Sequence, residues 1–81
     1  MLLPRRLSLR TQSSEERARW SVVRLDSGES LPGEVIEADA DTGTVRMRER
    51  GPDMIAQDGS RTLTWVEVDY RLHGGLAIVR R

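Results

Sequence analysis

Residues 31–50 read LPGEVIEADADTGTVRMRER, and this stretch decides the fold of the chain. Its centre, residues 39–43, consists of poor strand formers between two segments in which polar and apolar residues alternate. Gly43 can take the positive φ that ends a hairpin loop with a bulge. The pattern predicts a β-hairpin whose loop is either residues 41–43 or residues 39–43. Both loops place even-numbered residues opposite even-numbered residues, whereas a four-residue loop, which we do not expect, would break this partition.

This parity assigns two faces to the hairpin, because side chains alternate across a strand. One face is apolar and is expected to pack on the core. It carries Leu31, Val35, Val45 and Met47. The other face is ionic, because carboxylate and guanidinium groups become cross-strand or diagonal neighbours on it. It carries Glu34, Ile36, Thr44, Arg46, Arg48 and Arg50.

The row Arg46, Arg48 and Arg50 is the candidate binding site of the chain. Guanidinium groups carry forked donors that match phosphate and carboxylate oxygens, so the row can bind phosphate or an acidic partner surface. The alternative is a solvated face on which glutamates of the same hairpin pair with these arginines. Each such surface pair contributes only about 0–1 kcal/mol to stability.

Composition limits what the chain can do. Its 81 residues make one domain, and a chain this short buries only about 60% of its unfolded surface, so oligomerisation or docking would add stability. There is no Cys, which excludes disulfides, a thiolate nucleophile and a zinc–thiolate site. The 13 basic residues are all Arg and balance 13 acidic residues, so no global field draws the chain to nucleic acid or membrane. The exclusive use of Arg indicates either bidentate recognition or a genome whose base composition favours arginine codons.

The charge is unevenly distributed along the chain. Residues 1–19 hold five Arg and two Glu, a net charge of +3, and residues 20–81 hold eight Arg and eleven acidic residues, a net charge of −3. The apolar start is interrupted by Pro4, which argues against a secretory signal, and its Arg and Ser content has some features of an organelle transit peptide. No stretch is long and apolar enough to span a membrane. We expect a cytoplasmic protein with no membrane partner.

A short helix is expected to begin near Ser13, a suitable N-cap, with Glu15 and Glu16 in its first turn. It has no apolar stripe, and a helix of this length is marginal in water by itself. We therefore predict that residues 1–18 are a flexible Arg-rich N-terminal arm and that residues 19–81 form a single small β domain.

Several further segments have the character of short strands. They are residues 20–25, residues 54–57 and 60–63 on either side of an Asp-Gly pair typical of a type I′ turn, residues 62–71, and residues 76–79. Short strands with turns about every eight to twelve residues predict an all-β fold, which we expect to be a five- to six-stranded antiparallel meander or an SH3-like barrel. The expected core is Trp20, Val22, Leu31, Val35, Val45, Met47, Val66, Val68 and Ile78.

The sequence offers little catalytic chemistry. His73 is the single His and lies beside two glycines in an expected turn, and no phosphate-binding loop, HExxH pair or GxSxG elbow is present. The acids Asp39 and Asp41 faintly match a calcium loop, yet the twelfth position, which should be a bidentate Glu, is Arg50. Trp20 and Trp65 can act as stacking platforms for single strands, but a chain without Phe needs both in its core. We predict no catalytic residues, no metal and no cofactor.

The stretch EVIEADADTGTV at residues 34–45, followed by a β-rich tail that ends LAIV at residues 76–79, resembles a known group of proteins. These are short proteins encoded in tailed-phage and prophage genomes, often near the structural genes, in which an EADE-x-G turn joins two strands. The resemblance covers roughly residues 20–81. It implies a virion or assembly accessory role, and thus virion association, with no assigned site residues.

These observations together predict a non-enzymatic structural or interaction module whose partner is another protein or another copy of the chain. The alternative is a nucleic-acid-binding small β-barrel that uses the Arg-rich arm and the row Arg46, Arg48 and Arg50. Such binding would weaken steeply with salt. An enzyme would need a composite site at an oligomer interface.

Overall fold

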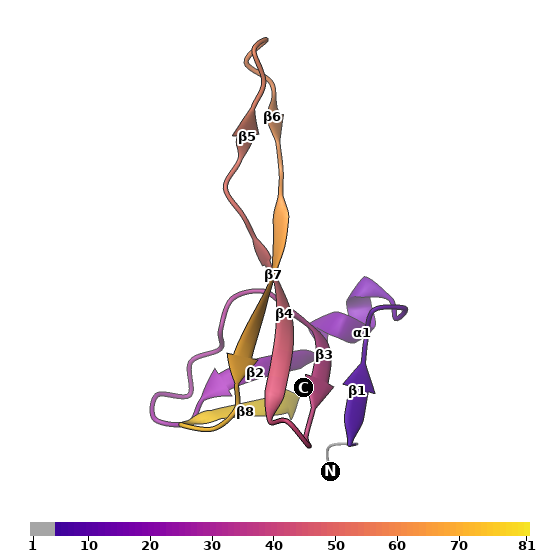
Figure 1. The fold of residues 1–81 in the computed structure, drawn as a ribbon, viewed down its shortest axis with the longest axis vertical. Coiled ribbons are helices and arrows are strands. Elements are labelled where there is room, and N and C mark those ends of the chain that lie inside the picture. The colour runs from indigo at the N-terminus through magenta and orange to yellow at the C-terminus, as the bar shows by residue number, and fades with distance from the viewer. Residues whose placement is uncertain (1–4) are drawn as a thin grey trace.

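The computed structural model describes residues 5–81, in which strands dominate and one hairpin projects from the body (Figure 1). The elements are β1 Arg6–Ser8, α1 Ser14–Ala18, β2 Trp20–Arg24, β3 Glu34–Asp39, β4 Thr44–Arg50, β5 Met54–Ile55, β6 Arg61–Thr62, β7 Trp65–Arg71 and β8 Leu76–Arg80. The all-β class expected from the sequence is confirmed. Among these residues no helix has the length and apolar character needed to cross a bilayer.

The strands pair in three antiparallel sheets. One has four strands in the order β1-β3-β4-β7, and the pairs β2-β8 and β5-β6 each form a ribbon of two strands. Within residues 5–81 these ladders do not close into a barrel, because β2 pairs with the last strand of the chain instead of joining the four-stranded sheet. The body is therefore a sheet with a ribbon packed on one face, in place of one continuous meander.

The core lies between the four-stranded sheet and the β2-β8 ribbon. Its buried members are Leu9, Trp20, Val22, Val35, Ala38, Val45 and Met47. Half-buried side chains that pack against them are Leu7, Leu31, Tyr70, Leu72, Leu76 and Ile78. The apolar face expected for the central hairpin is thus confirmed. Val66, which we expected in the core, is 42% exposed and Val68 is half-buried, because β7 runs out of the body toward the projecting hairpin.

The β3-β4 turn differs in length from both expected loops. Asp39 pairs with Thr44, so the turn consists of the four residues 40–43, and the expectation that a four-residue loop does not occur is wrong. The side chain of Asp39 explains this length, because its Oδ1 accepts a hydrogen bond of 2.9 Å from the backbone N–H of Asp41. Gly43 completes the turn with a φ of 66°.

A β-bulge at Ile36 compensates for the four-residue turn. Val35 pairs with Met47 on one side of the bulge, and Glu37 pairs with Arg46 on the other, so the register shifts by one residue between them. The shift cancels the change in turn length. As a result the expected pairing of even with even residues is wrong near the turn, while the inward residues of both strands stay inward.

The segment expected to be a flexible arm is part of the described fold from residue 5 onward. β1 extends the sheet by pairing with β3, and Leu9 is only 3% exposed in the core. The N–H of Leu9 donates to the carbonyl of Ile36 at 2.7 Å. Two leucines in three residues are too short a pattern to indicate a strand, which is why the sequence did not reveal it. Residues 1–4 of the expected arm lie outside the described residues.

The helix start is where the sequence places it. Ser13 caps α1, and its Oγ accepts a hydrogen bond of 3.1 Å from the N–H of Glu16. Glu15 and Glu16 occupy the first turn as expected. The helix packs along β3, where Arg17 Nε donates a hydrogen bond of 2.9 Å to Glu34 Oε2.

The projecting hairpin, which we define as residues 51–66, contains β5, β6 and the beginning of β7. Its turn is three residues long, because the N–H of Ala56 donates to the carbonyl of Ser60 at 2.9 Å and Gly59 has a φ of 86°. The prediction of a type I′ turn at Asp58-Gly59 is therefore wrong. Such a turn needs a positive φ at Asp58 as well as at Gly59, and Asp58 does not have one. The expected long strand over residues 62–71 is divided between β6 and β7.

Candidate functional site

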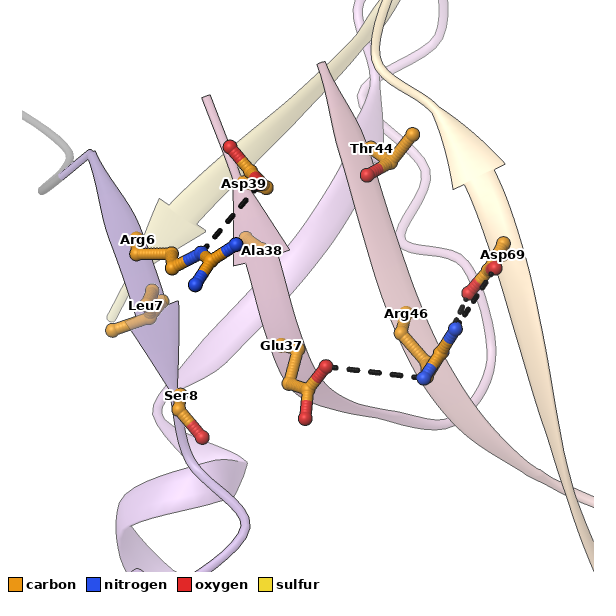
Figure 2. A pocket seen from close by; sticks show the side chains of 9 residues that line it. All are labelled: Arg6, Leu7, Ser8, Glu37, Ala38, Asp39, Thr44, Arg46 and Asp69. Carbon is orange, nitrogen blue, oxygen red and sulfur yellow. Dashed lines mark hydrogen bonds and ion pairs between the residues drawn. The ribbon is translucent and has the colours of Figure 1, made fainter. Parts of the chain in front are cut away.

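The three arginines of the candidate row project from β4, and Arg46 is held by acids on both sides. Its guanidinium binds Asp69 on β7 with two hydrogen bonds of 2.8 and 3.2 Å, and Glu37 on β3 lies 3.9 Å away (Figure 2). These bonds raise the pKa of Arg46 and lower the pKa of Asp69 below its usual value. The Arg46 guanidinium is therefore already occupied by carboxylates of its own sheet.

The other two arginines of the row have different surroundings. Arg50 pairs with Asp53 at 3.1 Å. Arg48 lies over the ring of Trp65, with its guanidinium carbon 5.3 Å from the ring centroid. Within residues 5–81 Arg48 has no carboxylate within 4.0 Å. The row is thus mostly a locally neutralised face, with Arg48 as its one cation that has an aromatic partner in place of an acid.

Arg10 connects this ionic face to the N-terminal segment. Its guanidinium donates two hydrogen bonds to Glu67 on β7, at 2.7 and 3.0 Å, and a further one to Glu37 on β3. These bonds raise the pKa of Arg10 and lower the pKa of Glu67. Arg10 was not among the residues expected at the site, because residues 1–18 were expected to be a flexible arm. The opposite net charges of residues 1–19 and 20–81 were the available signal.

Ile36 also lies on the ionic face, as the sequence placed it, but it is only 4% exposed. It lines a small hollow beside the side chains of Arg10, Arg17 and Arg48. The aliphatic stems of arginine can cover apolar surface while their heads stay in water. The arginines of this face therefore shield an apolar residue as well as pairing with acids.

A shallow depression of about 460 Å³ opens on the same face between β1, β3 and β4 (Figure 2). Its lining residues are Arg6, Leu7, Ser8, Glu37, Ala38, Asp39, Thr44, Arg46 and Asp69. The charged groups in it are satisfied by one another, since Arg6 lies 3.7 Å from Asp39 in addition to the pairs of Arg46. The depression therefore presents little unbalanced charge to a ligand.

The remaining candidates from the sequence occupy structural positions. His73 is exposed in the turn after β7, against Gly43, where an added Cβ would lie 2.7 Å from His73 Nε2. Asp39 stabilises the β3-β4 turn, and Asp41 pairs with Arg5 at 2.9 Å. Within residues 5–81 no group of three or more His, Cys, Asp or Glu side chains is arranged to hold a metal ion.

The two tryptophans are in opposite environments. Trp20 is buried in the core as expected, with 8% of its surface exposed. Trp65 is 50% exposed, so the expectation that both rings are needed in the core is wrong for Trp65. The core is filled instead by Leu9 and by half-buried aliphatic residues of β8. The ring of Trp65 is available at the base of the projecting hairpin.

Exposed apolar side chains are concentrated on the projecting hairpin. Among residues 5–81 seven large hydrophobic residues are exposed, and five of them lie on this hairpin, namely Met54, Ile55, Leu63, Trp65 and Val66. β5 and β6 pack on each other and stand clear of the body (Figure 1). An isolated two-stranded hairpin is at best marginally stable in water. This segment therefore combines apolar surface with a lack of support from its own chain.

Comparison with known proteins finds no family model, no curated protein and no solved structure that matches this chain.

Proposed function

We propose that this protein is a non-enzymatic interaction module that docks on a larger protein assembly through its projecting hairpin. The observation that carries the proposal is the concentration of exposed apolar residues on residues 51–66. Exposed apolar residues that are concentrated in one segment of a small domain are typical of a protein interaction site. The body supplies a stable base for the hairpin, because β4 and β7 continue into it.

The ionic face supports the same assignment. Arg10 and Arg46 on this face bind carboxylates of β3 and β7 and so connect the strands of the sheet from which the hairpin projects. We infer that this face supports the hairpin and that binding occurs at the hairpin. The relation to an SH3-like architecture is part of this proposal and rests on the small size and short antiparallel strands of the body.

The kind of assembly is suggested by the resemblance of the central hairpin to short phage and prophage proteins. We propose an accessory subunit of a virion or of its assembly intermediates. The support for this step is the sequence of residues 34–45 together with the β-rich tail.

Nucleic-acid binding through the arginine row has less support. A phosphate contact would have to displace Asp69 from Arg46 or Asp53 from Arg50. Arg48 is the exception, since it stacks on Trp65, and bases stack well on such aromatic platforms. Fluorescence anisotropy at low salt with single-stranded and double-stranded oligonucleotides tests this alternative. Salt-sensitive binding that Arg48→Gln abolishes would favour it over protein docking.

The docking proposal is tested by site-specific photo-crosslinking in cells that encode the protein. A photoreactive amino acid is placed at Ile55, which is 68% exposed on the hairpin, or at Leu25, which is 66% exposed on the body. We expect the probe at Ile55 to capture one defined protein and the probe at Leu25 to capture none. Purified wild-type protein should compete for this capture, whereas Met54→Ser combined with Leu63→Ser should not. Equal capture from both positions, or none from Ile55, would refute the proposal.

A further inference from the structure

The outer edge of β7 presents backbone N–H and C=O groups that have no partner strand. The hydrogen-bond pattern between β4 and β7 determines which residues these groups belong to. β7 is the last strand of the four-stranded sheet, paired with β4 on one side only. The ladder extends beyond both strand ends, where the N–H of Leu72 donates to Gly43 at 2.7 Å and that of Gly51 donates to Thr64 at 2.9 Å. Hydrogen-bonded and non-hydrogen-bonded pairs alternate in an antiparallel ladder. Even-numbered residues of β7 therefore bond to β4, and odd-numbered residues point their N–H and C=O groups outward.

This edge lacks the usual protection against strand addition. Exposed edges are normally blunted by charged side chains, especially Lys, by Pro, by a bulge or by a very short strand. β7 has seven residues, contains no Pro or Lys, and pairs with β4 without a register shift. Its acids Glu67 and Asp69 are bound by Arg10 and Arg46. Within residues 5–81 no other strand or loop makes a backbone hydrogen bond to the outward groups.

The apolar residues of the projecting hairpin lie around the start of this open edge. Trp65 and Val66 belong to β7 itself, and Leu63 lies two residues before its first residue. A strand added here would gain backbone hydrogen bonds and cover apolar side chains at the same time. The occupant must therefore be an extended strand with apolar residues of its own.

We propose that the occupant is a second copy of this chain, which adds its own β7 edge in antiparallel orientation about a two-fold axis at Trp65. This inference rests on the proposed function and names the partner of the same hairpin. A two-fold axis makes an interface self-complementary, so an axis at Trp65 brings the Trp65 residues of the two copies opposite each other. The joined sheets form one continuous eight-stranded sheet.

Charge and the exposed apolar residues together favour an axis at Trp65. With an axis at Glu67, the Glu67 side chains of the two copies would face each other. With an axis at Val68, Glu67 would face Asp69 of the other copy. Both arrangements place like charges opposite each other, which is unfavourable. An axis at Trp65 instead places Arg61 opposite Asp69 of the second copy and Leu63 opposite Glu67 of the second copy. Within the described residues Arg61 has no carboxylate within 4.0 Å, so its guanidinium is available for this contact. The zero net charge of the chain adds no overall repulsion between copies.

The first test measures self-association and amide exchange on the wild-type protein from low micromolar to millimolar concentration. Sedimentation velocity should show a concentration-dependent dimer. Hydrogen exchange by NMR should show that the outward amides of Trp65, Glu67 and Asp69 become at least about tenfold better protected as the dimer forms. The inward amides of Val66 and Val68 should be protected at every concentration. A dimer in which the outward amides still exchange freely would refute edge pairing.

Substitutions separate the backbone contact from the side chain. Glu67→Pro removes an outward N–H that β4 does not use, and Glu67→Gln removes the same charge while keeping the N–H. We expect Glu67→Pro to be monomeric and Glu67→Gln to dimerise. Arg61→Glu should weaken the dimer by about tenfold or more at low salt, because it faces Asp69 of the second copy in both halves of the interface. Should Glu67→Pro fail to fold, amide exchange on the wild type decides the question.

The outcomes also separate this inference from the proposed function. A wild-type protein that stays monomeric at millimolar concentration refutes the dimer. If the probe at Ile55 nevertheless captures a different protein, the docking function stands and only the second copy is excluded. If neither self-association nor capture occurs, both are wrong.

Discussion

Arg10 donates two hydrogen bonds to Glu67, one from Nη1 to Oε2 at 3.0 Å and one from Nη2 to Oε1 at 2.7 Å, across 57 positions of sequence. This contact joins the N-terminal segment to the edge strand β7. It lowers the pKa of Glu67 below its ordinary value of 4.5, chiefly because the hydrogen bonds favour the ionised carboxylate. The pair therefore stabilises the fold above pH 4.5, and its contribution is lost as the pH falls through the lowered pKa.

A carboxyl NMR titration checks this relationship. We expect Glu67 to titrate below 4.5 in the wild type and to return toward that value in Arg10→Gln. Asp69 serves as the internal control, since its pKa is lowered by Arg46 and should stay low in Arg10→Gln. An unshifted Glu67 in the wild type would mean that the contact does not persist in solution.

The N-terminal segment should contribute strongly to stability. Leu9 is 3% exposed, so Leu9→Ala should lower the free energy of unfolding by about 2–4 kcal/mol. Leu25, which is 66% exposed, is the matched control. Leu25→Ala should change the free energy of unfolding by less than about 0.5 kcal/mol. Urea unfolding followed by circular dichroism measures both. Equal, small effects would restore the picture of a free arm.

The two tryptophans should respond very differently to removal. Trp20→Ala should lower the free energy of unfolding by about 3–5 kcal/mol, because the ring is 8% exposed in the core. Trp65→Ala should lower the free energy of unfolding by only about 0.5–1 kcal/mol. This is the usual contribution of an exposed cation–π contact, such as the one that Arg48 makes with the Trp65 ring. Thermal and urea unfolding at low protein concentration measure the monomer in each case. A large loss from Trp65→Ala would place that ring in the core after all.

Gly33 is the glycine that the fold can least replace. Its φ is 105°, and an added Cβ would lie 2.6 Å from the backbone carbonyl oxygen of Arg48. Gly28 has a φ of 74° but no atom within 4 Å of an added Cβ, so Gly28→Ala measures backbone strain alone. We expect Gly28→Ala to cost about 1–2 kcal/mol and Gly33→Ala clearly more, or to prevent folding. Equal losses in urea unfolding would show that the carbonyl contact is not tight.

The sequence was informative where a pattern repeated over several residues. The alternation in residues 31–50 predicted the buried face of the central hairpin, and Ser13 with Glu15 and Glu16 predicted the start of α1. The all-β class followed from the same alternation and the spacing of turns. These features are local, so a single chain is enough to reveal them.

The failures concern contacts between segments far apart in sequence. Leu9 and Arg10 have no local pattern, and their roles depend on docking against β3 and β7. Trp65 was assigned to the core by composition, but the direction in which β7 leaves the body exposes it. The alternation of residues 44–50 predicted Arg46, Arg48 and Arg50 on one face of a strand, but the partner of Arg46 on β7 and the apolar hairpin beside the row depend on the tertiary arrangement.

The bulge at Ile36 has a consequence for how this hairpin tolerates length changes. If the pairing next to the turn is kept, a single residue added to or removed from the β3-β4 turn would move the core-facing residues of one strand to its solvent-facing side. The same change accompanied by loss or gain of the bulged residue would restore them. Insertions and deletions in residues 34–43 should therefore be viable only in compensating pairs, in the way that a second frameshift restores a reading frame.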